Sequence, residues 1–174
     1  MTFFEGLLAF LTNEVFIVPA CAWLIVQVVK ATINFIHTKS FSPARLFGEG
    51  GMPSGHSATV CALTVMCGVS YGFGSASFGI AFVLAAIVMH DALGVRQETG
   101  KQGEVIIELA KKYNEGISDD SEKIKTDKLK TLCGHTPLQV VVGASVGILI
   151  AVFYSLVLRD FFAGVGLAIQ GWAS

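Results

Sequence analysis

Residues 50–57 place three glycines, a proline, two serines and a histidine directly before a long apolar segment that starts at Ala58. Glycines let the backbone approach an anion closely, and the free N–H groups of a helix N-terminus favour negative charge. An imidazole beside such a turn, here His56, can donate a proton to a leaving oxygen. These residues therefore predict a phosphate-handling loop at the end of a membrane helix.

Long uncharged segments indicate that the helices positioning this loop span a membrane. The 174 residues are 53% apolar and only 14% charged, with a mean hydropathy of +0.66, whereas soluble proteins carry about 25% charged residues. Residues 58–89 and 138–158 contain no Lys, Arg, Asp or Glu. We expect an all-α integral membrane bundle that forms a single domain over residues 1–174.

The predicted bundle has about four to five transmembrane helices. A crossing needs roughly 20 apolar residues, and four segments come close to this length. They are residues 14–36, 56–72, 75–94 and 137–158. Two further apolar segments, 3–11 and 161–172, are short, and the sequence does not decide whether they span the membrane or lie in its interface.

The only region with a soluble composition is a polar insertion at 97–134. Apolar residues at helical spacing predict an amphipathic surface helix at 104–113, followed by a charged stretch at 118–130. Most basic residues lie in this insertion and in the segment that joins the first two spanning helices. The positive-inside rule therefore places both polar segments, and the amphipathic helix, in the cytoplasm.

This topology brings candidate residues from distant parts of the chain to one face of the membrane. Besides residues 50–57, they are Lys30, Arg45, Asp91, Arg96 and His135. Cations offset the charge of a phosphate, and arginine forks match its oxygens. Two histidines can divide the roles of nucleophile and acid, but the residues alone do not decide which histidine takes which role. Arginines beside neutral imidazoles are an unusual set for a metal, so we predict no metal site.

Two motifs carry a family resemblance. Pro53-Ser54-Gly55-His56 is the first, and the second runs from His135 through Gln139 to Gly143 in a His-x-x-x-Gln-Val-x-x-Gly pattern. Together they resemble the type 2 phosphatidic acid phosphatase superfamily, which includes the vanadium haloperoxidases. Lys30 and Arg45 fit its first motif loosely. Residues 91–96 resemble a divergent branch of membrane proteins, in which an insertion separates the motif arginine from the histidine.

The resemblance implies a metal-independent, cofactor-free phosphatase that hydrolyses a lipid or isoprenoid phosphate monoester or pyrophosphate. It assigns His135 as the nucleophile that forms a phosphohistidine. It assigns His56 as the acid that protonates the leaving alcohol and then activates water. The implied phosphate ligands are Lys30, Arg45, Ser54, Gly55 and Arg96. A haloperoxidase activity is disfavoured, because those relatives are soluble proteins.

Gln139 departs from the family pattern, in which an acid stands four residues after the nucleophilic histidine. An amide oxygen can accept the Nδ1–H hydrogen bond, but it supplies no negative charge to the ring. Asp91 and Glu98 are candidates for supplying that charge if the fold brings either near His135. If nothing does, the alternative function is a weakly active or inactive membrane protein that binds a phosphate lipid, such as a carrier or a regulatory subunit.

Each of these residues also has a purely structural interpretation. Thr136 and Pro137 are a typical helix start, so His135 can be an ordinary residue preceding a helix. Ser57 can be a cap, and Lys30 and Arg96 can be cytoplasmic anchors. The near-neutral composition gives no support for nucleic-acid binding, which needs a basic face. The predicted partners are the bilayer, a phosphate-bearing substrate within it and, because four helices form a thin bundle, a second copy of the chain.

Overall fold

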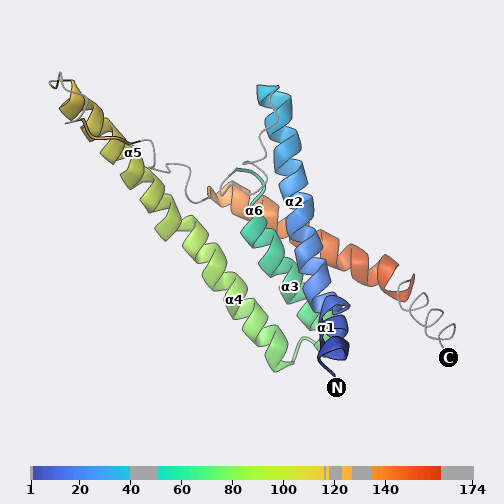
Figure 1. Cartoon of the computed structure of the whole chain (residues 1–174). Coiled ribbons are helices and arrows are strands. Elements are labelled where there is room, and N and C mark those ends of the chain that lie inside the picture. The colour runs from blue at the N-terminus through green and yellow to red at the C-terminus, as the bar shows by residue number, and fades with distance from the viewer. Residues whose placement is uncertain (1, 40–50, 116, 118–122, 127–134, 162–174) are drawn as a thin grey trace.

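The computed structural model describes residues 2–39, 51–115, 117, 123–126 and 135–161, and within them it contains helices and no strand. The predicted all-α class is therefore confirmed. The elements are α1 (Phe3–Leu11), α2 (Glu14–Thr38), α3 (Gly55–Tyr71), α4 (Ala76–Leu93), α5 (Val95–Asn114), α6 (Pro137–Phe153) and η2 (Tyr154–Leu158). Three predicted features, Arg45, segment 162–172 and most of the stretch 118–130, lie outside the described residues (Figure 1).

Polar caps at the N-termini explain where the four helices of the bundle begin. Asn13 caps α2, Ser54 caps α3, Ser75 caps α4 and Thr136 caps α6, each accepting a hydrogen bond from a backbone N–H of the first turn. Such caps satisfy donors that the helix itself leaves without partners. The predicted spans 14–36, 56–72, 75–94 and 137–158 therefore match helices of similar bounds.

Three described helices are long and apolar enough to cross a membrane: Glu14–Thr38, Ala76–Asn114 and Pro137–Phe161. The predicted count of four to five spanning helices is not confirmed. α3 falls short with 17 residues, about 26 Å at the usual helical rise. It lies between α2, α4 and α6 and is rich in small and hydroxyl-bearing residues, because it faces protein rather than lipid.

In chain order the four bundle helices alternate in direction, so α3 and α6 run the same way and cross at an angle (Figure 1). The core is formed by small and medium side chains that are at most 2% exposed: Val18, Ala22, Ala62, Met66 and Ala151. Large apolar side chains instead point outward, among them Leu24 at 54%, Ile80 at 70% and Leu149 at 67% exposure. In a membrane these outer faces contact lipid tails.

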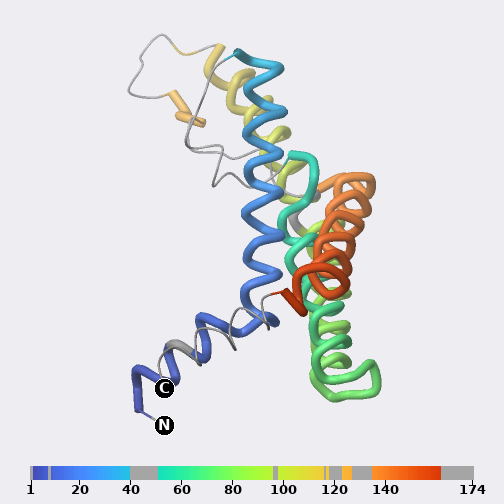
Figure 2. The backbone as a smooth tube through the Cα atoms, turned by 90° about the vertical axis from the view of Figure 1, so that its right-hand side faces the viewer, coloured from blue at the N-terminus to red at the C-terminus, as the bar shows by residue number. Residues whose placement is uncertain are grey.

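Helices α1 and α5 lie outside this bundle. α1 has nine residues, too few for a crossing, and turns away from α2 at Thr12 and Asn13 (Figure 2). α5 confirms the predicted amphipathic helix, but it begins at Val95 rather than at 104. The reason is that α4 passes into α5 through Gly94 alone, so the polar residues 95–103 continue an existing helix and need no new nucleus.

A polar contact closes the bundle at the end where α2 begins. Arg159 Nη2 and the Ser70 hydroxyl each lie 2.7 Å from Glu14 Oε1. They join the start of α2, the last turn of α3 and the helical turn after η2. Charge-assisted hydrogen bonds of this length are about twice as strong as neutral ones. The contact therefore fixes the far ends of three helices.

Replacing Arg159 with leucine is expected to destabilise the protein by about 1–3 kcal/mol, because Glu14 loses its charged partner. The measurement is thermal unfolding of the detergent-solubilised protein, with Asp160→Asn as the neighbouring control. Any phosphate-dependent activity should persist, since the histidines lie at the opposite end of the bundle. A melting temperature equal to that of the control would contradict a role for this ion pair in stability.

Candidate functional site

Two glycines of α6 set its distance from α3. A Cβ atom built on Gly143 would collide with the backbone oxygen of Ser54, and one built on Gly147 would collide with the backbone oxygen of Ala58. Small residues four apart allow such close backbone approach in membrane helices. The later glycine of α6 meets the later residue of α3, so the two helices run in the same direction and begin at the same end of the bundle.

Two other helices reach this same place, α2 with its middle and α4 with its C-terminal end. Val26 of α2 lies 3.8 Å from the Cβ position of Gly55, and the Ala92 carbonyl of α4 accepts a 3.0 Å hydrogen bond from the backbone N–H of His135. The start of α3 and His135 therefore lie together at one end of the bundle, while residues 40–50 and 127–134 of the two polar segments lie outside the described residues. Two helix N-termini, each carrying positive partial charge, meet here beside two histidines.

The turn before α3 is held by hydrogen bonds to α6. Gly51 adopts a φ of 82°, which favours glycine. The Ser54 N–H donates to the Gln139 carbonyl at 3.1 Å. The Ser54 hydroxyl oxygen accepts from the Ser57 N–H and from the Ser57 hydroxyl. Ser54 is therefore the cap of α3, Ser57 supports it, and both side chains are fully buried.

His135 is fixed by its neighbours in the chain and by α4. Its side chain is only 5% exposed, and its Nδ1 lies 3.2 Å from Gln139 Oε1. Thr136 and Gln139 form the capping box that starts α6, so the helix start predicted from Thr136 and Pro137 is correct. His135 can therefore both precede a capped helix and serve as a chemical group.

Hydrogen bonding to Gln139 determines the tautomer of His135. Gln139 Oε1 accepts a 3.1 Å hydrogen bond from the Thr136 backbone N–H. Since the same oxygen lies against Nδ1 of His135, it can bond to that nitrogen only if Nδ1 carries a proton. In a neutral ring the lone pair is then on Nε2. Gln139 therefore orients the ring as an acid would, without adding a negative charge.

His56 lies in the first turn of α3 and is exposed. Its ring centroid is 6.3 Å from that of His135, with the two planes inclined at 57°. The rings are thus neighbours that do not stack, one enclosed and one open to the outside. A tetrahedral anion bound at the two helix N-termini can contact both imidazoles.

The remaining predicted site residues within the described part of the chain lie in α2, α3, α4 and α5. Lys30 is half-buried in α2, one helical turn beyond Val26. Asp91 is half-buried next to Ala92, whose carbonyl holds His135. Arg96 belongs to the first turn of α5. Gly55 is buried, yet a Cβ there would meet Trp23 at an ordinary 3.5 Å, so packing alone does not require this glycine.

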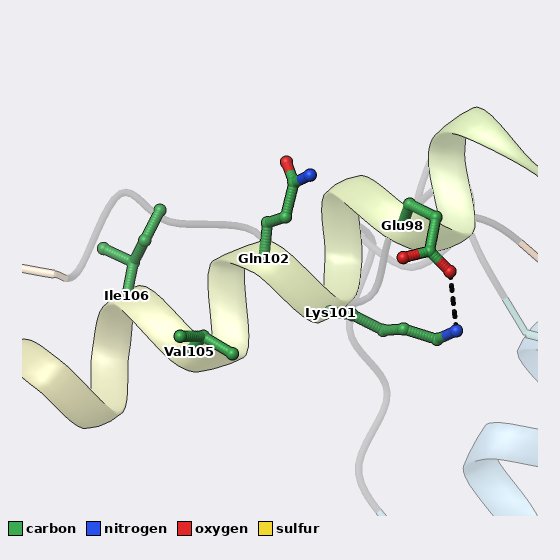
Figure 3. A pocket seen from close by; sticks show the side chains of 5 residues that line it. All are labelled: Glu98, Lys101, Gln102, Val105 and Ile106. Atoms are coloured by element: carbon green, nitrogen blue, oxygen red, sulfur yellow. Dashed lines mark hydrogen bonds and ion pairs between the residues drawn. The ribbon is translucent and has the colours of Figure 1, made fainter.

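A separate hollow of about 450 Å³ lies along α5 (Figure 3). Its lining residues come from a single helix: Glu98, Lys101, Gln102, Val105 and Ile106. Its charged groups pair with each other, since Lys101 Nζ is 2.6 Å from Glu98 Oε1. None of the predicted site residues lines it. We therefore assign the candidate site to the ends of α3 and α6 and not to this surface.

Three features of the site were not predicted from the sequence. Gly147 sets the helix spacing together with Gly143, and a small-xxx-small pattern search would have found it. The Ala92 carbonyl anchors His135, and no sequence signal marks a backbone acceptor. Gln27 is a buried amide in the middle of α2, which an inspection of polar residues in apolar segments would have found.

Apolar helices long enough to span a membrane define the class: a helical integral membrane protein, whose candidate site holds a histidine pair at two helix N-termini. The chain belongs to the divergent PAP2 family, whose model matches residues 11–150. It is 37% identical to YuiD of Bacillus subtilis (strain 168), described as an uncharacterized membrane protein, over 158 residues, or 87% of this chain and 98% of that protein. No solved structure matches significantly. The predicted family resemblance is confirmed.

Proposed function

We propose that this protein is a membrane phosphatase that hydrolyses a lipid or isoprenoid phosphate through a phosphohistidine on His135. The observation that carries the proposal is the histidine pair, with ring centroids 6.3 Å apart at two helix N-termini. Family membership supports it, because the PAP2 motifs are those of phosphate-handling proteins. The lipid-facing exposure of the surrounding helices favours a substrate whose tail remains in the bilayer.

In the first chemical step, the lone pair on Nε2 of His135 attacks phosphorus. The bond from phosphorus to the substrate oxygen breaks, and that oxygen takes a proton from a protonated His56. A phosphohistidine and a free alcohol result. Proton donation to the leaving oxygen accelerates such a step by about 100- to 10,000-fold.

In the second step, the now neutral His56 takes a proton from water, and the water oxygen attacks phosphorus. The bond from phosphorus to Nε2 breaks, inorganic phosphate leaves, and both histidines return to their starting states. The N-termini of α3 and α6, with Lys30, Arg45 and Arg96, offset the charge on the phosphoryl oxygens. Gly55 contributes a backbone N–H, and Ser54 contributes its hydroxyl proton.

The orientation of the site is part of the proposal. Basic residues are concentrated in the two polar segments that precede His56 and His135 in the sequence, and the positive-inside rule then places the histidine end in the cytoplasm. A cysteine-accessibility experiment with a membrane-impermeant thiol reagent, on an added cysteine at Lys123, would test this. Labelling in inverted vesicles but not in whole cells is the expected result.

The decisive test is phosphate release by the purified full chain from a panel of lipid and isoprenoid phosphates in the presence of a chelator. The expected result is release from at least one substrate at an unchanged rate after divalent cations are removed. Loss of activity on chelation would contradict the metal-independent mechanism. Absence of release from every member of the panel would favour the second candidate function.

That second candidate is a membrane protein that binds a phosphate lipid without turnover, and Gln139 motivates it. Gln139 Oε1 accepts hydrogen bonds but does not stabilise the positive ring that forms as His135 attacks. We expect Gln139→Glu to raise the rate of phosphate release by about 10- to 1,000-fold, because a carboxylate stabilises that charge. The variant keeps the side-chain length and the capping box.

The matched control is Gln139→Met, which keeps a similar length and removes the acceptor. We expect this variant to lose activity, since Nδ1 no longer has its partner and the tautomer is not selected. A wild-type protein without turnover and an active Gln139→Glu variant would establish binding as the natural function. Equal rates in all three proteins would contradict any role for position 139.

A further inference from the structure

One buried polar side chain is not used by the mechanism above. Gln27 of α2 is 7% exposed, and its Oε1 has no hydrogen-bond partner within the described part of the chain. A buried acceptor without a donor costs free energy, and native proteins rarely retain one without a reason. The amide is therefore a candidate for contact with a bound molecule.

The position of Gln27 along α2 places it at the level of the histidine site. Val26 Cγ1 lies 3.8 Å from the Cβ position of Gly55, the first residue of α3. Gln27 follows Val26 by about 1.5 Å along the helix axis toward the site end. Lys30 is three residues further on, so it and Gln27 share one face of α2.

We propose that Gln27 belongs to the substrate site and that its amide oxygen accepts a hydrogen bond from a hydroxyl or amino group on the alcohol part of the substrate. The proposal rests on the proposed function and deepens it. A phosphate dianion offers only acceptors, so an amide oxygen beside it needs a donor from another part of the substrate. The preferred substrates are then phosphate monoesters of lipid alcohols with a free donor next to the ester carbon, and isoprenoid phosphates are disfavoured.

The experiment compares two substrates that differ in one hydroxyl. The first is a lysophosphatidate with a free 2-hydroxyl, and the second is its 2-deoxy analogue with the same acyl chain. We expect wild-type kcat/KM to favour the hydroxylated substrate by about 10- to 100-fold, and Gln27→Leu to reduce this ratio to near unity. Asn34→Leu is the control: it also changes an amide of α2 to leucine, but at a site where Asn34 contacts Thr38.

Two further measurements separate this proposal from its alternatives. Thermal unfolding of Gln27→Leu should show no loss of stability, because leucine removes a buried unpaired acceptor. If the amide had a purely structural role, its replacement would lower the stability. Binding of the corresponding non-hydrolysable phosphonates, with and without the hydroxyl, should show the same Gln27-dependent preference. This binding readout is independent of turnover, so it decides on Gln27 even if the phosphatase function itself fails.

Three outcomes would overturn the proposal. An unchanged substrate ratio in Gln27→Leu would mean that, in the wild-type protein, the amide oxygen accepts a hydrogen bond only from a buried water. An equal loss for both substrates would point to a protonated phosphate oxygen as the donor. Failure of both phosphonates to bind the wild-type protein would remove the substrate contact altogether.

Discussion

Replacing His135 with alanine is expected to reduce phosphate release by about 10,000-fold or more, to the level left by binding and electrostatics alone. The physical reason is that Nε2 of His135 is the atom that forms the bond to phosphorus in the proposed mechanism. The loss should appear in kcat with little change in KM, because the phosphate ligands remain. His37→Ala, at an exposed position in the last turn of α2, is the matched control.

The His56→Ala variant distinguishes the two histidines. Release from an alkyl phosphate should fall about as far as in His135→Ala, because the leaving alkoxide then lacks a proton donor. With an aryl phosphate, whose leaving group needs no proton, the phosphohistidine should form and accumulate, because water is no longer activated. Acid-labile label on His135 after a rapid quench is the readout. Accumulation in His135→Ala instead would reverse the two roles.

The second large effect is expected at the glycines between α3 and α6. Gly147→Ala should destabilise the protein by about 3 kcal/mol, because the added methyl group meets the backbone of Ala58 and the helices must separate. Gly143→Ala should act in the same way against Ser54. Since Ser54 and Gln139 are hydrogen-bonded across this contact, the histidines also move apart, and a shift of about 1 Å can cost about 100-fold in rate.

Gly79→Ala makes the same chemical change, but we expect the opposite effect on stability. Gly79 lies in α4, and no atom lies within 4 Å of a Cβ placed there. Alanine has a higher helix propensity than glycine by about 1 kcal/mol, so this variant should be neutral or slightly stabilised. Thermal unfolding and phosphate release of the three variants, measured side by side, check both signs. Equal effects at Gly79 and Gly147 would show that helix contact does not limit stability.

Much of the fold follows from local patterns. Long uncharged segments predicted the helices at 14–36, 56–72, 75–94 and 137–158 to within a few residues, because apolar length is a property of contiguous residues. One boundary was wrong, the start of α5, and the spanning of α3 is not confirmed. Both depend on what lies beside each helix, and neighbouring elements are not visible in a local window.

The composition of the candidate site and the convergence of its residues on one membrane face were predicted, but the contacts between them were not. His56, His135 and Gln139 were recognised from motif spacing, and the hydrogen bond between His135 and Gln139 follows from their separation of one helical turn. The structure shows the Ser54 hydroxyl capping α3. The role of Ser54 as a phosphate ligand therefore remains a prediction. Gln27 was not predicted as a site residue, although it is a polar residue in an apolar segment, because a single amide there belongs to no motif.

The amino-acid sequence was sufficient for the family, the helical membrane class and the identity of the two histidines, because apolar length and motif spacing are properties of contiguous residues. Their juxtaposition was decided by tertiary structure. His56 and His135 are separated by a long stretch of chain, and they meet because Gly143 and Gly147 let α6 lie against α3 in parallel. The same packing buries Gln27 without a partner, because burial depends on which helix faces are brought together.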